Sequence, residues 1–410
     1  MIYIMLILFI FFWYRNVFSN SRSLKFIVSL YFFSFICGFV LDYIGFFTFE
    51  SPWNIKSLLF IFITLTISFG ALSKVDLVKF SLKKPSLLLS SIILKLLVFL
   101  SCISTVLYFS DFLNFIRSPD LGMARLEMQA GEIESRGIIY SFFAAISFSF
   151  HINLYLFFDA FLKGDKKISL IALFGSFSYI FWVSSVFGRD GFVFWVISFC
   201  FYFYLFKDQV SSKIKYYFSL TFSIIGVLFI VLFIQMSSSR FLGHSKYSND
   251  YNINPVLLST LDYTGQQLRN INTYYSMANI DHTYGQYSFS YYFKPFIDSN
   301  SLKNSQEKAQ IDILKSGKPH FYFAFFLKEI WIDFGAFGAL IFTTFIISIL
   351  NFVFKTVYQF RSIFLLYIVY TQFLITGLFY NKFYFPSANA FLLFIFILII
   401  VENFIYVRKK

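Results

Sequence analysis

Residues 168–206 read ISLIALFGSFSYIFWVSSVFGRDGFVFWVISFCFYFYLF, and this stretch decides the fold class. It consists of two apolar runs, each close to the roughly 20 residues that a membrane-spanning helix needs. Its charged residues, Arg189 and Asp190, lie together in the turn between the runs, flanked by Gly188 and Gly191. The pattern predicts a hairpin of two spanning helices whose tip reaches the membrane surface.

The rest of the chain has the same apolar character. Of its 410 residues, 58% are hydrophobic and 13% are charged, and the mean hydropathy is +0.70. A soluble chain of this length needs more charge to cover its surface, so the composition excludes a soluble globular protein. The three cysteines lie within apolar runs, which favours neither a disulfide framework nor a metal site. We predict an all-α polytopic membrane protein with about 11 transmembrane helices. The runs lie near residues 1–14, 24–47, 57–73, 86–109, 138–162, 168–187, 191–206, 217–236, 325–354, 362–380 and 383–402.

Lys and Arg gather in alternate connections between these runs. Cytoplasmic connections of membrane proteins carry an excess of Lys and Arg, so the pattern predicts an N-terminus outside and a C-terminus in the cytoplasm. The same distribution explains much of the net charge of +13 without a nucleic-acid partner. The cytoplasmic set holds 18 of the 34 basic residues: Arg15, Arg22, Lys25, Lys74, Lys79, Lys83, Lys84, Lys163, Lys166, Lys167, Lys207, Lys213, Lys215, Lys355, Arg361, Arg408, Lys409 and Lys410.

The longest outward connection is an insert of more than 80 residues, which divides the chain into three parts. We predict transmembrane helices in 1–236, a large external loop in 237–324, and further transmembrane helices with a cytoplasmic tail in 325–410. The insert has scattered apolar residues and a nearly balanced charge, which argues against disorder. Its patterns predict short helices at 254–278 and 301–314, and a break at Gly317–Pro319.

No nucleotide-binding or metal-binding signature occurs in the sequence. An enzyme working on the outer side of the membrane has no nucleotide supply, so we expect an activated substrate carried on a lipid. The GRDG turn allows two interpretations. Arg189 and Asp190 form a local ion pair at the membrane surface, or Arg189 binds a pyrophosphate through its planar guanidinium.

Three stretches resemble a known family: SSVFGRDGFVFWVISF (184–199), LDYTGQQLRNINTYYSMANIDHTYGQYSF (261–289) and FFLKEIWIDFGAFGALIF (325–342). Together with the large external loop, they are similar to the Wzy-type repeat-unit polymerases of bacterial O-antigen and capsule. The resemblance covers about residues 180–350 and extends to the related O-antigen ligases. It implies a glycosyltransferase C-like membrane fold in the bacterial inner membrane, with the active face external.

The implied reaction transfers a growing glycan from undecaprenyl pyrophosphate onto a new lipid-linked repeat unit. Neither a cofactor nor a metal is expected, and a polysaccharide chain-length regulator is a further partner that the resemblance suggests. The departing pyrophosphate needs cations, and the incoming sugar hydroxyl needs a base. We predict Arg189 as the first cation and either His282 or His320 as the base, with His244 behind them. Predicted substrate-binding residues are Arg240, Arg269, Arg136, Tyr263, Tyr284 and Lys294.

Each candidate also has a plain structural interpretation. The arginines are equally explained as solvated charges, the histidines as polar surface residues, and the tyrosines as the core of the loop or an interfacial belt. Asp281 either orients His282 or caps a turn. Glu329 and Asp333, one helical turn apart, either face an active-site cleft or support arginines. Gly335 and Gly338 next to them suit close helix packing.

Three other functions remain open at this point. A lipid-linked oligosaccharide flippase is the main alternative, although such transporters are expected to have repeated halves and short loops. A membrane acyltransferase would need a histidine within a membrane helix, and His151 is in that position. A structural scaffold is the third.

Overall fold

The computed structural model describes residues 2–47, 52–75, 88–117, 137–186, 188, 190–213, 215–216, 253–277, 280–315, 323–356 and 361–409. Within these ranges the regular secondary structure is helical, and an isolated parallel β-bridge joins Phe325 and Tyr380. Contacts divide it into two units, Met1–Ser86 with Leu261–Lys410, and Leu87–Thr260. The predicted division into membrane segments and an external loop depends on which side of the membrane each segment faces, and it stays a prediction.

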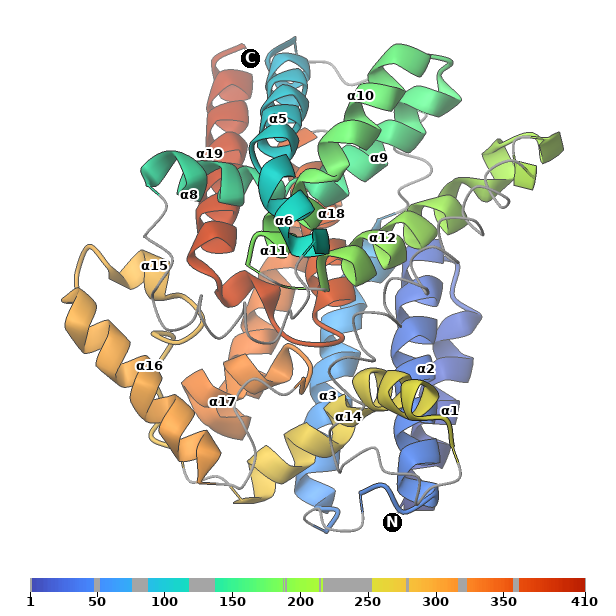
Figure 1. Ribbon diagram of the computed structural model, residues 1–410, viewed down its shortest axis with the longest axis vertical. Coiled ribbons are helices and arrows are strands. Elements are labelled where there is room, and N and C mark those ends of the chain that lie inside the picture. The colour runs from blue at the N-terminus through green and yellow to red at the C-terminus, as the bar shows by residue number, and fades with distance from the viewer. Residues whose placement is uncertain are drawn as a thin grey trace. The chain divides into compact units, whose positions relative to one another are not determined.

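The first unit contains nine of the helical elements that matter for the site and most of a tenth, α14, whose first residues up to Thr260 belong to the second unit (Figure 1). These are α1 (Ile2–Val17), α2 (Arg22–Tyr43), α3 (Ile55–Gly70), α14 (Pro255–Met277), α15 (Ser290–Phe293), α16 (Ser299–Leu314), α17 (Leu327–Val353), α18 (Arg361–Thr376), η6 (Lys382–Tyr384) and α19 (Pro386–Lys409). The second unit contains α5 (Leu88–Leu107), α6 (Phe109–Arg117), α8 (Ile138–Ser147), α9 (Phe150–Leu162), α10 (Lys166–Ser176), α11 (Ser178–Ser184) and α12 (Asp190–Phe206).

Among the described residues, seven helices are long and apolar enough to cross a membrane, and the bent pair α8 and α9 makes an eighth if it counts as one span. Two shorter apolar helices, Leu6–Val17 and Ser362–Thr376, also coincide with predicted runs. The protein is therefore a membrane-embedded helical protein, as its composition predicts. The predicted run at 217–236 lies outside the described residues, and the total of 11 spans stays a prediction.

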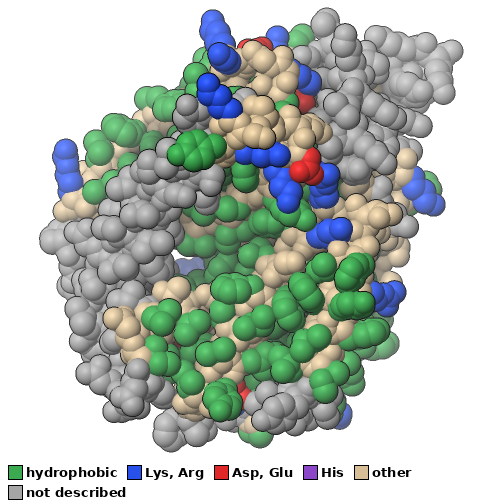
Figure 2. Space-filling view, turned by 90° about the vertical axis from the view of Figure 1, so that its right-hand side faces the viewer, with side chains coloured by type: hydrophobic (Ala, Val, Ile, Leu, Met, Phe, Trp, Pro, Cys, Tyr) green, Lys and Arg blue, Asp and Glu red, His purple; other side chains and the backbone are tan. Residues whose placement is uncertain are grey.

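The outer surface of α1, α2 and α3 is suited to lipid. Ile7, Phe11, Phe33 and Ile63 are among the large apolar side chains exposed on these helices. Figure 2 shows a broad field of apolar side chains on the side where Figure 1 places α1 and α2. Exposed hydrocarbon of this extent on several helices is what a lipid-facing surface requires.

Small hydroxyl side chains join the helices of the second unit. The hydroxyls of Ser101 and Ser149 lie 2.8 Å apart, as do those of Ser104 and Ser147. Both pairs connect α5 to the α8–α9 segment, which bends by 48° at its break. Small residues let membrane helices approach closely and hydrogen-bond across their interface.

Helix α14, which belongs to the long insert, packs directly against α2. A Cβ atom placed on Gly265 would lie 2.4 Å from the backbone nitrogen of Gly38, so only glycine permits this approach of the two backbones. The Ser34 hydroxyl of α2 donates to the Thr264 carbonyl of α14 at 2.5 Å. The insert is thus anchored to helices from the start of the chain.

The other end of α14 is tied to the start of α3. The Asn272 side-chain oxygen accepts hydrogen bonds from the Asn54 backbone N–H at 2.9 Å and the Ser57 hydroxyl at 2.6 Å. Its amide nitrogen donates to the Pro52 carbonyl at 3.1 Å. The short helices predicted at 254–278 and 301–314 are thus confirmed as α14 and α16, whereas the predicted break at 317–319 lies outside the described residues.

Candidate functional site

Helix α17 changes its surroundings at Gly335. Every residue from Leu327 to Asp333 is buried, whereas Phe337, Ile341 and Phe345 are 77%, 56% and 61% exposed. Gly335 has φ +66° and ψ −179°, a backbone conformation that side chains other than glycine rarely adopt, and it breaks the helix at this point. The segment before Gly335 therefore lies inside the protein, and the segment after it presents an apolar face outward. The expectation that Gly335 serves close helix packing is thus replaced by a role in breaking the helix.

The loop after α14 is bound to the last buried residue before this break. One oxygen of Asp333 accepts hydrogen bonds from the Thr283 hydroxyl at 2.5 Å and from the backbone N–H groups of Gly285 and Tyr287 at 3.0 Å. Its second oxygen accepts from the Ser288 N–H at 3.0 Å. A fully buried carboxylate is costly unless it is hydrogen-bonded, and these four donors meet that need.

His282 lies at the start of the same loop, half-buried beside Gly335. Its Nδ1 lies 3.2 Å from the Ile332 carbonyl oxygen, which can only accept a hydrogen bond. The proton of a neutral imidazole must therefore be on Nδ1, and Nε2 is left as the proton-accepting nitrogen. Nε2 is the atom nearest to the position that a Cβ on Gly335 would take, at 2.7 Å.

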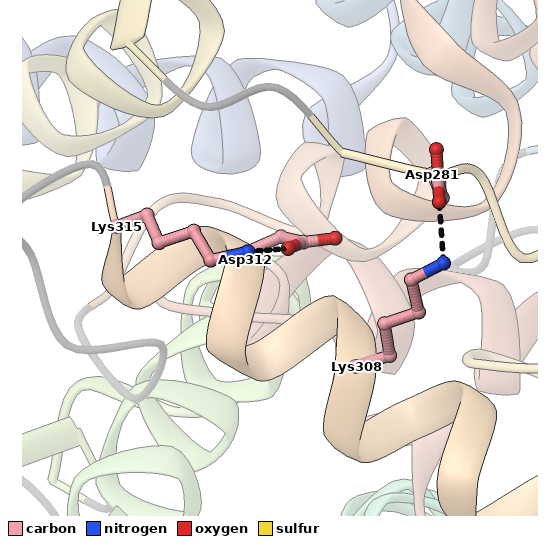
Figure 3. A network of polar contacts seen from close by, with 4 residues as sticks. All are labelled: Asp281, Lys308, Asp312 and Lys315. Atoms are coloured by element: carbon pink, nitrogen blue, oxygen red, sulfur yellow. Dashed lines mark hydrogen bonds and ion pairs between the residues drawn. The ribbon is translucent and has the colours of Figure 1, made fainter.

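Asp281 is directed to a different partner. It forms an ion pair with Lys308 of α16 at 2.5 Å, with both side chains exposed (Figure 3). The hydrogen bond and charge of Lys308 lower the pKa of Asp281, and those of Asp281 raise the pKa of Lys308. The Ile332 carbonyl, and not Asp281, is thus the group that orients the His282 ring.

Two of the predicted substrate-binding residues, Tyr284 and Lys294, lie on or beside this loop. Tyr284 is 74% exposed and has a positive φ of 51°, which is uncommon for a residue with a side chain. Its N–H donates to the Asp333 carbonyl at 2.9 Å, which holds the strained turn in place. Lys294 is exposed directly after α15, and its neighbour Phe293 packs beside Gly285. His282, Tyr284 and Lys294 therefore belong to one segment that is attached to α17.

The other two described candidates lie on α14. The Arg269 guanidinium is buried, 4.5 Å from the Trp53 ring centre, and donates to the Phe47 carbonyl at 3.4 Å. Tyr263 is half-buried, with its ring edge to face against Phe323 at 5.3 Å. In this structure Arg269 fastens α14 to the connection between α2 and α3.

The Asp333 region is supported from α19 and from a buried ion pair. The Asn389 side chain donates to the Ser288 carbonyl at 3.2 Å, and the Tyr292 hydroxyl donates to the Asn389 carbonyl. Burial raises the pKa of Tyr292 to about 12. Lys328 and Glu329 form an ion pair at 3.2 Å, and Glu329 accepts from the Asn381 N–H at 3.2 Å. Glu329 thus supports the turn before η6.

Sequence reasoning named His282 as one candidate base but missed the groups that hold it. Asp333 was expected to line a cleft or support arginines, and the structure shows it gathering the 283–288 loop instead. The available signal was an acid two residues before a glycine within a buried apolar run, WIDFG. Arg189, Arg240, Arg136, His320 and His244 lie outside the described residues, so their predicted roles stay predictions.

No family model, curated protein or solved structure matches this chain. In the described part of the chain, no group of three or more His, Cys, Asp or Glu side chains is placed to hold a metal ion.

Proposed function

We propose that the protein is a polymerase of lipid-pyrophosphate-linked oligosaccharide repeat units. The observation that carries the proposal is the position of His282. Its imidazole has Nδ1 fixed by a carbonyl and Nε2 left as an acceptor, and it lies where α17 turns from the protein interior to an exposed apolar face. A base at such a border suits a substrate with a polar head and a long hydrocarbon tail.

In the proposed reaction, His282 Nε2 takes the proton from a hydroxyl of the incoming repeat unit. That oxygen attacks the anomeric carbon of the growing glycan, and the bond between this carbon and the pyrophosphate oxygen breaks. The lipid pyrophosphate leaves with the bonding electrons, and the imidazolium then releases its proton to water. The proposal assigns the charge on the departing pyrophosphate to Arg189, because bidentate arginine contacts stabilise phosphate oxygens.

The exposed face of α17 supports a lipid-borne substrate in particular. Phe337, Ile341 and Phe345 continue the helix away from the break beside His282. A polyprenyl chain lying along these side chains would bring its pyrophosphate to the level of the imidazole. The exposed Tyr284 is then available to stack on a sugar ring of the same substrate.

Deleting the gene in its bacterial host and restoring it with variants tests the proposal. We expect the deletion strain to display single repeat units and no polymer, and plasmid-borne His282→Gln at wild-type protein levels to leave this pattern unchanged. The Asp312→Asn variant is the matched control, because this acid of α16 pairs with Lys315, directly after the helix, at 2.7 Å and is not bonded to His282 (Figure 3). Loss of single units as well as polymer would indicate a flippase and refute the polymerase.

A further inference from the structure

Asp333 is connected to His282 by a short and continuous set of contacts. The carboxylate binds Thr283, which follows His282 directly in the chain, and the backbone carbonyl that receives His282 Nδ1 belongs to Ile332, which precedes Asp333. A second backbone contact, from the Thr283 N–H to the Ile332 carbonyl at 3.4 Å, runs alongside. Two consecutive residues of the loop, His282 and Thr283, thus bind two consecutive residues of α17, Ile332 and Asp333.

The loop contains a strained turn directly after Thr283. Tyr284 and Gly285 both have positive φ, and the Gln286 N–H closes the turn onto the Thr283 carbonyl at 3.0 Å. Turns with two central residues of positive φ favour Asn and Gly, so a tyrosine at the first position must be held there by its surroundings. The Asp333 backbone carbonyl holds the tyrosine itself by accepting its N–H, and the Asp333 carboxylate holds the next residues of the turn by accepting the N–H groups of Gly285 and Tyr287.

We infer that Asp333 is a positioning residue for the His282 base, holding the 283–288 turn so that the Ile332 carbonyl can select the Nδ1–H form of the imidazole. This inference rests on the proposed function for its catalytic consequence. The carboxylate itself touches no reacting atom. Its effect passes through the backbone to Nε2, which must carry no proton when the acceptor hydroxyl arrives.

Asp333→Asn is the most direct test, because it keeps the side-chain volume and removes one acceptor. The amide NH₂ would face one of the N–H donors, either that of Ser288 or those that converge on the other oxygen. Thr283→Val is the milder companion, since it removes one of the four donors and leaves the carboxylate with three backbone N–H groups. Asp312→Asn, in α16 of the insert, controls for loss of a buried carboxylate that does not bind the 283–288 loop.

We expect Asp333→Asn to lower kcat by about 100-fold, the effect of a reacting group displaced by about 1 Å, with KM within about threefold of the wild type. The kcat of Thr283→Val should lie between those of the wild type and Asp333→Asn. In purified protein with ¹⁵N-labelled histidine, assigned by His282→Gln, alkaline buffer should show wild-type Nε2 unprotonated. Asp333→Asn should show a mixture of the two tautomers.

The nitrogen spectrum separates this inference from the proposed function. If Asp333→Asn folds as a monodisperse protein and keeps the wild-type tautomer, Asp333 does not position His282 and the inference is wrong, whatever the activity. If the wild type makes no polymer while the tautomer still responds to Asp333→Asn, the proposed function fails and the positioning of His282 stands. Wild-type kcat in Asp333→Asn would overturn the inference as well.

Discussion

Gly335→Ala is the substitution that most sharply tests the geometry around His282. Gly335 has φ +66° and ψ −179°, and holding an alanine in such a sparsely populated conformation costs about 1–3 kcal/mol. The new methyl group would also lie 2.7 Å from His282 Nε2, whereas ordinary contacts begin at 3.4 Å. The ring must therefore retreat by about 0.7 Å, the difference between these two distances.

In the proposed reaction, a shift of this size would misplace the His282 base relative to the acceptor hydroxyl. Misplacement of about 1 Å costs on the order of 100-fold in rate, so we expect Gly335→Ala to lose most of its polymerising activity. The assay is polymer formed per minute by purified protein from lipid-linked repeat units, with the unfolding temperature recorded on the same sample.

Gly70→Ala is the matched control. Nothing lies within 4 Å of a Cβ at this position, and its backbone is helical. Wild-type activity and a gain of up to about 1 kcal/mol in unfolding free energy are expected. Activity within twofold of the wild type in Gly335→Ala would refute the placement of Nε2 against Gly335.

Two further predictions concern the attachment of the insert. Gly265→Ala places a methyl group 2.4 Å from the backbone nitrogen of Gly38 and should lower the unfolding free energy by about 1–3 kcal/mol. This loss should appear as a lower temperature of thermal inactivation in detergent. An unchanged inactivation temperature would show that α2 and α14 are not in direct contact. Asp281→Asn should leave activity within about twofold of the wild type, because exposed ion pairs contribute little. Since Lys308 lowers the pKa of Asp281, the contribution of the pair is complete above the ordinary pKa of 3.8 and is lost as the pH falls through the lowered value. Since the pKa of Lys308 is raised, the contribution of the pair is complete below pH 10.5 and is lost as the pH rises through the raised value. The melting-temperature difference between the wild type and Asp281→Asn should therefore stay constant between pH 6 and 9. A steep change of this difference in that range would contradict the assignment.

The apolar runs predicted the long apolar helices of the described part of the chain, because bilayer-spanning segments must satisfy their backbone groups internally. The helices at 24–47 and 191–206, for example, appear as α2 and α12 within a few residues. The bends were not predictable in the same way. Neither the 48° break between α8 and α9 nor the break at Gly335 changes the hydropathy of its run, since both arise from local backbone geometry.

The candidate site was predictable only in part. His282 was one of three histidines of the insert that were candidates for the base, because an imidazole can accept a hydroxyl proton near neutral pH, and no spacing in the sequence chose between them. Its orientation depends on the Ile332 carbonyl, a backbone group 50 residues away that no side-chain pattern reveals. Adjacency in sequence suggested Asp281 as the partner, yet Lys308 competes for that carboxylate because it lies on the facing helix α16.

The central claim is that His282 is the base of a repeat-unit polymerase, and reconstitution tests it most directly. Purified protein in lipid vesicles is supplied with undecaprenyl-pyrophosphate-linked repeat units, and the products are separated by length. We expect a ladder of polymer and free undecaprenyl pyrophosphate from the wild type and from Asp312→Asn, and unreacted single units from His282→Gln. A normal ladder from folded His282→Gln, or no polymer from the wild type, would contradict it.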